Sequence, residues 1–183
     1  MFNIPTYLIE QQVLAADTDT VTLTYTAPSV AWTPRHLLIR INARTGRGNT
    51  RDTINVRFNG DTGANYNTQR LSAVASSAAA GRLSAQTSLV DIIEAAADSA
   101  SANVFGGGEL LVPDAFSTRS HKSVVAFSGG AEAGVRANAG RWADTSAITS
   151  VTLRSDNSAD LLTLSTFDLC VVDESFNHTE EII

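Results

Sequence analysis

Short segments in which apolar and polar residues alternate recur along most of the chain. In one of them Val21, Leu23 and Tyr25 are separated by threonines, and a second alternation covers 37–44. A period of two residues is typical of a β-strand with one buried face. Clusters rich in Pro, Gly, Asn and Ser separate these segments and indicate turns. The pattern predicts strands over 18–26, 37–44, 54–58, 88–93, 108–112, 122–127, 148–154 and 161–172.

The number and spacing of these segments predict an all-β fold. Residues 8–14 could form a further strand or an arm on a neighbouring subunit, which gives about eight to nine strands in all. Turn signals at short intervals are typical of β-sandwiches, and we expect a jelly-roll-like β-sandwich. We divide the chain into an N-terminal arm over 1–16, a sandwich domain over 17–172 and an acidic C-terminal arm over 173–183.

Two stretches lack a clear alternation. Residues 67–87 are rich in Ala and Ser and show no amphipathic stripe, so we expect a long surface excursion, with a partly helical excursion as the alternative. Residues 131–146 are expected to form a loop that carries Trp142. After the strand at 88–93, the alanines at 95–97 favour a helix by themselves, so a short helix is the alternative to that strand.

A dense turn signal directly follows the strand at 54–58. An Asn-Gly dipeptide accepts positive φ at little steric cost, and a second glycine follows within the loop. Asn and Asp side chains can bond to nearby backbone groups and so lock a turn. We therefore assign a structural role to the turn residues Asn59, Gly60, Asp61, Gly63 and Asn65.

The side-chain oxygens of this turn, together with those of Asp52, offer an alternative interpretation as a calcium site. Their spacing is not that of an EF-hand, and a single carboxylate within the loop supplies little charge for Ca²⁺. We therefore expect no metal ion here, and we expect no other cofactor in the protein.

The 183 residues suit a single domain with a net charge of −6, but positive charge is distributed unevenly. Eight arginines lie within 35–82, opposed only by Asp52 and Asp61. A planar guanidinium can hold a carboxylate through two N–H groups, so basic and acidic segments suit docking between copies or onto a charged scaffold. Solvated charge on sheet faces is the alternative. Scattered arginines in an acidic chain, without interleaved aromatic residues, argue against nucleic acid as a partner.

Catalytic motifs are missing from the sequence. The three histidines lie far apart without metal-ligand spacing, and there is no G-x-S-x-G motif, so we expect no enzymatic activity. Trp32 and Trp142 could stack on sugars, although a tryptophan more often fills a core or a subunit contact. With Cys170 as the only cysteine, no disulfide can form within the chain. No apolar run approaches the roughly 20 residues of a membrane-spanning helix, so we expect no membrane association.

Several phrases of the sequence resemble a family of small virion proteins of tailed bacteriophages. They are RFNGDTGANY (57–66), ANVFGGGELLVPD (102–114), HK (121–122) and GRWADTSAITSVTL (140–153). Members of this family are found among head-decoration proteins and among tail or fibre components. The resemblance covers roughly residues 35–172 and implies a virion part made in the cytoplasm of a host bacterium.

Within that family, the segregated charges favour a capsid decoration (cement) protein at the surface of the head. Its expected partners are further copies of itself, in a homotrimer, and the major capsid protein. A tail or fibre module that binds host-surface glycan through Trp142 or Trp32 is the alternative. The residues expected at the interfaces are Phe2, Ile4, Tyr7, Arg40, Arg44, Arg47, Arg51, Phe176, Ile182 and Ile183.

Overall fold

A computed structural model describes residues 6–27 and 34–172, and the regular structure in these ranges consists entirely of β-strands. The strands are β1 (Thr6–Val13), β2 (Val21–Thr24), β3 (His36–Thr45), β4 (Arg51–Phe58), β5 (Tyr66–Val74), β6 (Ser77–Gln86), β7 (Leu89–Ala97), β8 (Gly106–Val112), β9 (Lys122–Gly130), β10 (Gly134–Trp142), β11 (Ser150–Ser155) and β12 (Thr166–Val172). The all-β prediction is therefore confirmed.

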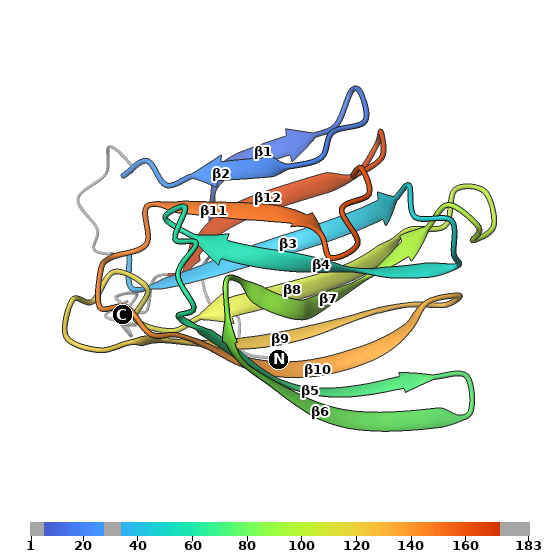
Figure 1. The fold of residues 1–183 in the computed structure, drawn as a ribbon. Helices are drawn as coiled ribbons and strands as arrows, with labels where there is room; N and C mark the ends of the chain where they lie inside the picture. The colour runs from blue at the N-terminus through green and yellow to red at the C-terminus, as the bar shows by residue number, and fades with distance from the viewer. Residues whose placement is uncertain (1–5, 28–33, 173–183) are drawn as a thin grey trace, which may run out of the picture.

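The twelve strands form one continuous sheet that folds over into two layers (Figure 1). The eight-strand layer has the order β1-β12-β3-β8-β9-β10-β5-β6, and the four-strand layer has the order β2-β11-β4-β7. The layers are joined where the end of β3 runs parallel to β7, with Arg44 beside Ala96 and Thr45 beside Ala97. The result is a sandwich-like arrangement of unequal layers.

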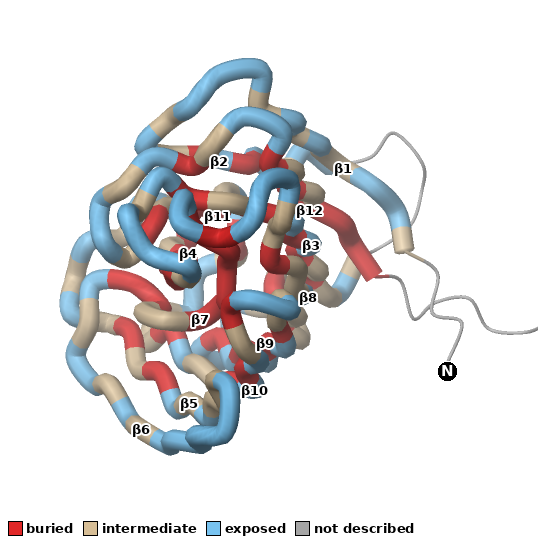
Figure 2. Tube along the Cα trace, turned by 90° about the vertical axis from the view of Figure 1, so that its right-hand side faces the viewer, coloured by how far each residue is buried: buried red, intermediate tan, exposed pale blue. Residues whose placement is uncertain are grey.

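The core fills the space between the two layers, where buried residues concentrate (Figure 2). The apolar positions of the alternating segments supply part of this core. The buried residues include Leu37, Ile39 and Ile41 of β3 and Val21 and Leu23 of β2. Each such side chain contributes about 1.5–3 kcal/mol relative to an exposed one. The predicted inward faces of these strands are thus confirmed.

The prediction of a long surface excursion over 67–87 is wrong. This segment forms the hairpin of β5 and β6, and β5 also pairs with β10 from Tyr66 to Ala73. Small residues give no periodic signal here because β6 lies at the edge of the sheet, where both of its faces meet solvent. A tight turn at 74–77 links the two strands and places Ala75 at a φ of 50°.

The prediction of a loop over 131–146 is also wrong, because β10 occupies most of it. β10 continues the ladder from β9, and a turn that requires Gly134 at a φ of 135° connects them. Together with the β5–β6 hairpin, β10 raises the number of strands from the eight or nine predicted to twelve. Trp142 is the last residue of this added strand.

The strand predicted at 88–93 is confirmed and extends as β7 through the alanines, which rules out the helical alternative. Ala95, Ala96 and Ala97 are fully buried where β7 crosses the eight-strand layer. Space there is limited, since a Cβ atom added to Gly106 would lie only 2.7 Å from Cα of Ala95. Close packing therefore overrides the helix preference of alanine.

The N-terminal arm predicted over 1–16 is largely part of the sheet. β1 pairs with β12, from Thr6 beside Val172 to Val13 beside Thr166, with a bulge between Leu8 and Glu10. The rest of the expected N-terminal arm, at 1–5, and the C-terminal arm, at 173–183, lie outside the described residues.

Candidate functional site

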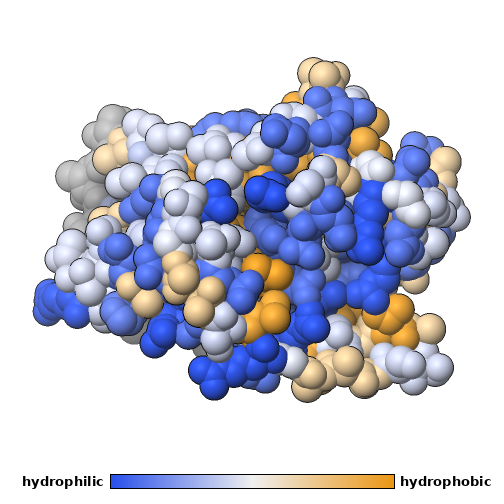
Figure 3. All heavy atoms as spheres, in the orientation of Figure 1, coloured by the Kyte–Doolittle hydropathy of each residue, from blue (hydrophilic) through white to orange (hydrophobic). Residues whose placement is uncertain are grey.

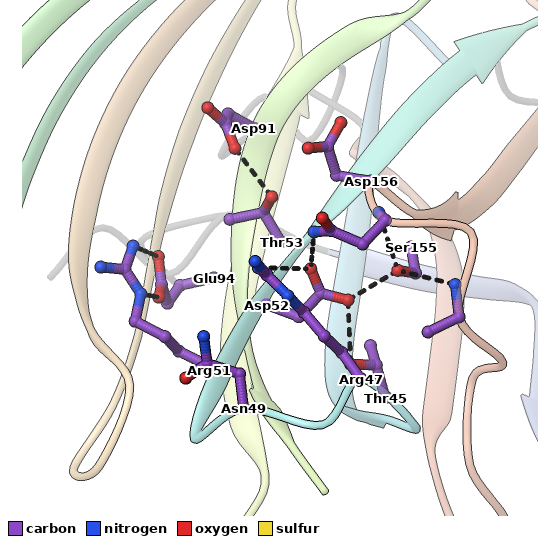
Figure 4. A network of polar contacts seen from close by, with 12 residues as sticks. Thr45, Arg47, Asn49, Arg51, Asp52, Thr53, Asp91, Glu94, Ser155 and Asp156 are labelled. Atoms are coloured by element: carbon purple, nitrogen blue, oxygen red, sulfur yellow. Dashed lines mark hydrogen bonds and ion pairs between the residues drawn. The ribbon is translucent and has the colours of Figure 1, made fainter. Parts of the chain in front are cut away.

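A buried ion-pair network lies between the layers, centred on Glu94 of β7 (Figure 4). The Glu94 side chain is fully buried, and Arg51 of β4 donates to it from Nε at 2.8 Å. Arg136 of β10, with a side chain only 5% exposed, donates to Glu94 from the opposite layer. Both carboxylate oxygens of Glu94 are therefore engaged with guanidinium groups, which suits a carboxylate that ties two layers together.

Asp52 is the centre of a second buried group beside the first (Figure 4). It accepts hydrogen bonds from Thr45 at 2.9 Å, from Ser155 at 2.6 Å and from Asn157 at 2.6 Å, while Arg47 lies 3.5 Å away. These donors come from β3, β11 and the turn that follows β11. Asp52 thus fastens the ends of neighbouring strands in the four-strand layer to β3.

A hollow of about 270 Å³ lies between the two groups and is lined by Asp52, Arg136 and Asp91, among others. Asp91 occupies a bulge of β7 at a φ of 58°, accepts from Thr53 at 2.7 Å and forms an ion pair with Arg70. The carboxylates bordering the hollow, those of Asp52, Asp91 and Asp156, all accept hydrogen bonds from other parts of the chain. Among residues 6–27 and 34–172, no group of three or more His, Cys, Asp or Glu residues is placed to hold a metal ion.

The turn after β4 has the backbone geometry predicted for it: Asn59 has a φ of 51° and Gly60 a φ of 65°. The Asn59 side chain also bridges to another strand. Its Nδ2 donates to the Ala147 carbonyl at 2.8 Å, and its Oδ1 accepts from the Thr149 amide at 2.8 Å. Asn59 is therefore both the turn residue and the anchor that fixes the start of β11.

Asp61 organises the remainder of the turn through three donors. It accepts from the Gly63 amide at 2.7 Å, from Asn65 Nδ2 at 2.9 Å and from Trp142 Nε1 at 2.6 Å. Although partial burial opposes ionisation, these hydrogen bonds together hold the pKa of Asp61 below its usual value. The calcium alternative is wrong in its geometry, because Asp52 belongs to the separate network described above.

Aromatic packing holds the Trp142 ring in the position from which its Nε1 donates to Asp61. Trp142 is 1% exposed and stacks with Tyr66, ring centroids 6.3 Å apart, while the Phe58 ring lies 5.6 Å from it. Burial raises the pKa of Tyr66 to about 12, so its hydroxyl stays protonated and donates to the Phe58 carbonyl. A buried Trp142 cannot stack on a sugar, and Trp32 lies outside the described residues.

Lys122 is a buried cation that the sequence did not single out. Its ammonium group donates to the carbonyl oxygens of Ser117 at 2.6 Å, Ser120 at 3.1 Å and Thr145 at 3.1 Å. Burial lowers the pKa of Lys122. With the lysine 1% exposed, these bonds fasten two long loops to the start of β9.

The four arginines predicted at interfaces all have partners within the chain. Arg40 pairs with Glu109 at 3.1 Å, Arg47 with Asp52 and Arg51 with Glu94. Arg44 donates to four carbonyl oxygens of the loop between β7 and β8, those of Asp98, Ala100, Ser101 and Val104. Tyr7 is half exposed on β1. The other predicted interface residues, Phe2, Ile4, Phe176, Ile182 and Ile183, lie outside the described residues.

The outer side of the eight-strand layer carries apolar side chains that the sequence analysis did not select. Phe127 is 67% exposed, and Val125, Leu71 and Val135 are between 48% and 57% exposed. The pairing registers place Leu71, Ala137 and Phe127 in one row across β5, β10 and β9. We call this surface the outer apolar face; it comprises Leu71, Ala73, Ala80, Val125, Phe127, Val135, Ala137 and Ala139.

Two adjacent rows that cross the outer side of this layer differ in polarity. The row of Phe127 continues through Glu109, Arg40, Asp168 and Gln11 and is charged or polar on β8, β3, β12 and β1, whereas the row of Val125 continues through the apolar Leu111, Leu38, Cys170 and Leu8. A shallow hollow of about 460 Å³ lies over β5, β6, β9 and β10. Polar residues dominate the view in Figure 3, and apolar residues gather over the β5–β6 hairpin at the lower right and in other groups near the lower centre and the upper right. Consecutive apolar residues at 124–127 were the available signal, because they make both faces of a strand apolar.

Replacing Asn59 by valine should lower the free energy of unfolding by about 2 kcal/mol or more, because a β-branched residue is strained at positive φ and the bridge to β11 is lost. Urea unfolding would measure the effect. Asn59→Gly is the matched control: it accepts the same φ without strain and loses only the side-chain bonds. Equal losses in the two variants would contradict the role of backbone strain.

Comparisons with protein-family models, with curated proteins and with solved structures give no match for this chain. Among the described residues, no helix is long and apolar enough to cross a membrane.

Proposed function

We propose that the protein is a non-enzymatic structural protein of a bacteriophage virion that attaches to the assembled head as a decoration protein. The observation that carries this proposal is the outer apolar face, where four large apolar side chains about half exposed or more lie close together. Contiguous exposed apolar surface of this kind marks interaction sites on soluble proteins. The resemblance to tailed-phage virion proteins supports the setting, and the major capsid protein is the proposed partner.

The charged residues support a role in binding rather than in catalysis. Glu94, Asp52 and Arg44 direct their hydrogen-bonding groups at other parts of the same chain, where they stabilise the sandwich. The strand pairing of the sandwich presents the outer face already formed, which reduces the ordering cost on binding. Binding that occurs only on the assembled lattice stabilises the head by mass action, and joining several copies raises their effective concentration.

Attachment to heads provides the test. Particles that lack the protein would be incubated with the purified chain, and the bound copies would be counted by quantitative mass spectrometry. We expect many copies per head, higher resistance of the particles to heat, and a loss of both with the double variant Leu71→Ser/Phe127→Ser.

Leu164→Ser is the matched control, because Leu164 is 63% exposed but lies in the turn before β12, away from the outer apolar face. Unimpaired attachment of the double variant would contradict the proposed docking face. A small number of copies confined to the tail would contradict the head position and favour the tail or fibre alternative.

A further inference from the structure

The β6 edge of the eight-strand layer is open. β6 pairs only with β5 among the described strands, and it forms one margin of the sheet (Figure 1). Residues 77–80 are exposed. A strand with one neighbour presents a row of backbone N–H and C=O groups that can pair with a further strand. We propose that this further strand is β6 of a second copy, so that two eight-strand layers join antiparallel across a two-fold axis.

The composition of β6 leaves the first part of this edge, up to Gly81, without the usual protection, and only its far end has a bulge, at residues 84–85. Proteins protect edge strands with charged residues, prolines or bulges. From Ser77 to Gly81, β6 contains only Ser, Ala and Gly. The ladder with β5 is regular from Ser77 to Leu83, and Arg82 is the only charged residue of the strand. A second strand can therefore approach along β6 from Ser77 to Leu83, the part before the bulge.

The two other margins of the described sheet are protected, which favours β6 of the second copy over its other edges. β2 is only four residues long, and side chains of β1 cover its backbone: Glu10 accepts from the Thr24 amide at 2.6 Å, and Gln12 donates to the Thr22 carbonyl at 3.0 Å. β1 has a bulge at Ile9, which interrupts the pairing geometry. Pairing of two identical edges closes as a dimer, whereas pairing of different edges would grow into fibres.

The alternation of β6 restricts the register of such a pair. Ala78, Ala80 and Arg82 lie on the outer side, and residues opposite each other across antiparallel strands share a face. A two-fold axis at Ala80 places Ala80 beside Ala80 of the second copy and Arg82 beside Ala78 of the second copy. No like charges are then directly opposite, and each larger side chain meets a small one.

This register also connects the two outer apolar faces. Phe127, Ala137, Leu71 and Ala80 lie in one row, and that row would continue across the axis into the same row of the second copy. The pairing itself rests on the β6 edge alone. Its use as a double docking surface rests on the proposed function, since two linked faces would attach more strongly than one.

Introducing a positive or a negative charge at Ala80 tests the pairing and its register together. Sedimentation of the purified full-length chain over a range of concentrations should show a dimer. Ala80→Lys and Ala80→Glu should each weaken the dimer by about fivefold or more, because like charges would lie directly opposite at the axis. An equimolar mixture of the two variants should restore a dimer that contains one copy of each.

Circular dichroism of each variant checks the fold, which an exposed edge residue should leave unchanged. A wild-type chain that stays monomeric, or that forms the trimer expected from the sequence, would overturn the pairing. Undiminished dimerisation of Ala80→Glu alone would overturn the register centred on Ala80. Leu71→Ser/Phe127→Ser should still dimerise while losing attachment to heads, so failure of the pairing and failure of the proposed function are distinguishable.

Discussion

Replacing Glu94 by glutamine should lower the free energy of unfolding by about 3–5 kcal/mol, because it removes one partner of a buried ion pair. Glutamine keeps the shape of the side chain but leaves Arg136, 5% exposed, with only the Asp91 carboxylate, 4.0 Å from its Nη1, as a compensating charge. Arg51 is more exposed and can turn towards water, so most of the cost should come from Arg136. Equilibrium unfolding in urea is the appropriate measurement.

Two further variants separate the charge effect from a general loss of contacts. Glu109→Gln breaks the surface pair with Arg40 and should cost no more than about 1 kcal/mol. The double variant Glu94→Leu/Arg136→Met removes both buried charges and should recover much of the stability lost in Glu94→Gln. A Glu94→Gln effect as small as that of Glu109→Gln would show that the buried network does not hold the layers together.

Replacing Trp142 by alanine should cost about 3–5 kcal/mol, the range for removing a large buried aromatic side chain. The substitution removes the packing against Tyr66 and Phe58 and deprives Asp61 of its donor at 2.6 Å. Thermal unfolding followed by circular dichroism would measure the loss.

Trp142→Phe is the matched control for this second expectation. It retains an aromatic ring in the core but lacks the N–H group, so its cost should be clearly smaller than that of Trp142→Ala. A stable Trp142→Ala protein, within about 1 kcal/mol of the wild type, would contradict the central packing role of this residue.

The parts of the fold that the sequence predicts best are the strands with one buried and one solvated face. β3 is the clearest case, because Leu37, Ile39 and Ile41 face the core and the charged Arg40 faces outward. There the local pattern and the tertiary environment agree. The turn at Asn59 and Gly60 was predictable for a related reason, since positive φ restricts the choice of residue locally.

The strands that escaped prediction are those whose environment is set by distant parts of the chain. β6 is composed of small residues and is stabilised by pairing with β5, which in turn depends on β10, more than sixty residues away in the register of Leu71 and Ala137. β7 contains an alanine run that suits a helix, and only the crowded crossing at Gly106 makes those alanines necessary in a strand.

The candidate site was the least predictable part for the same physical reason. Glu94 and Arg136 lie on different strands and meet only when the layers close, so no spacing in the sequence connects them. In the arginine-rich segment, Arg44 and Arg51 reach carbonyl and carboxylate groups of their own chain, and no spacing in the sequence indicates these partners. Phe127 had a visible signal, the apolar run at 124–127, whose meaning depends on which face of β9 is covered.

The pairing of the first described strand with the last has a consequence for biosynthesis. β1 has β12 as its partner in the ladder, and the two are separated by nearly the whole length of the chain. At about 5–20 residues per second, the ribosome releases β12 roughly 10–30 s after β1. During that interval β1 has no partner and Ile9, which packs against the core in the folded chain, is in contact with water. We therefore expect nascent chains to need shielding by chaperones and to become resistant to protease only after β12 has left the ribosome.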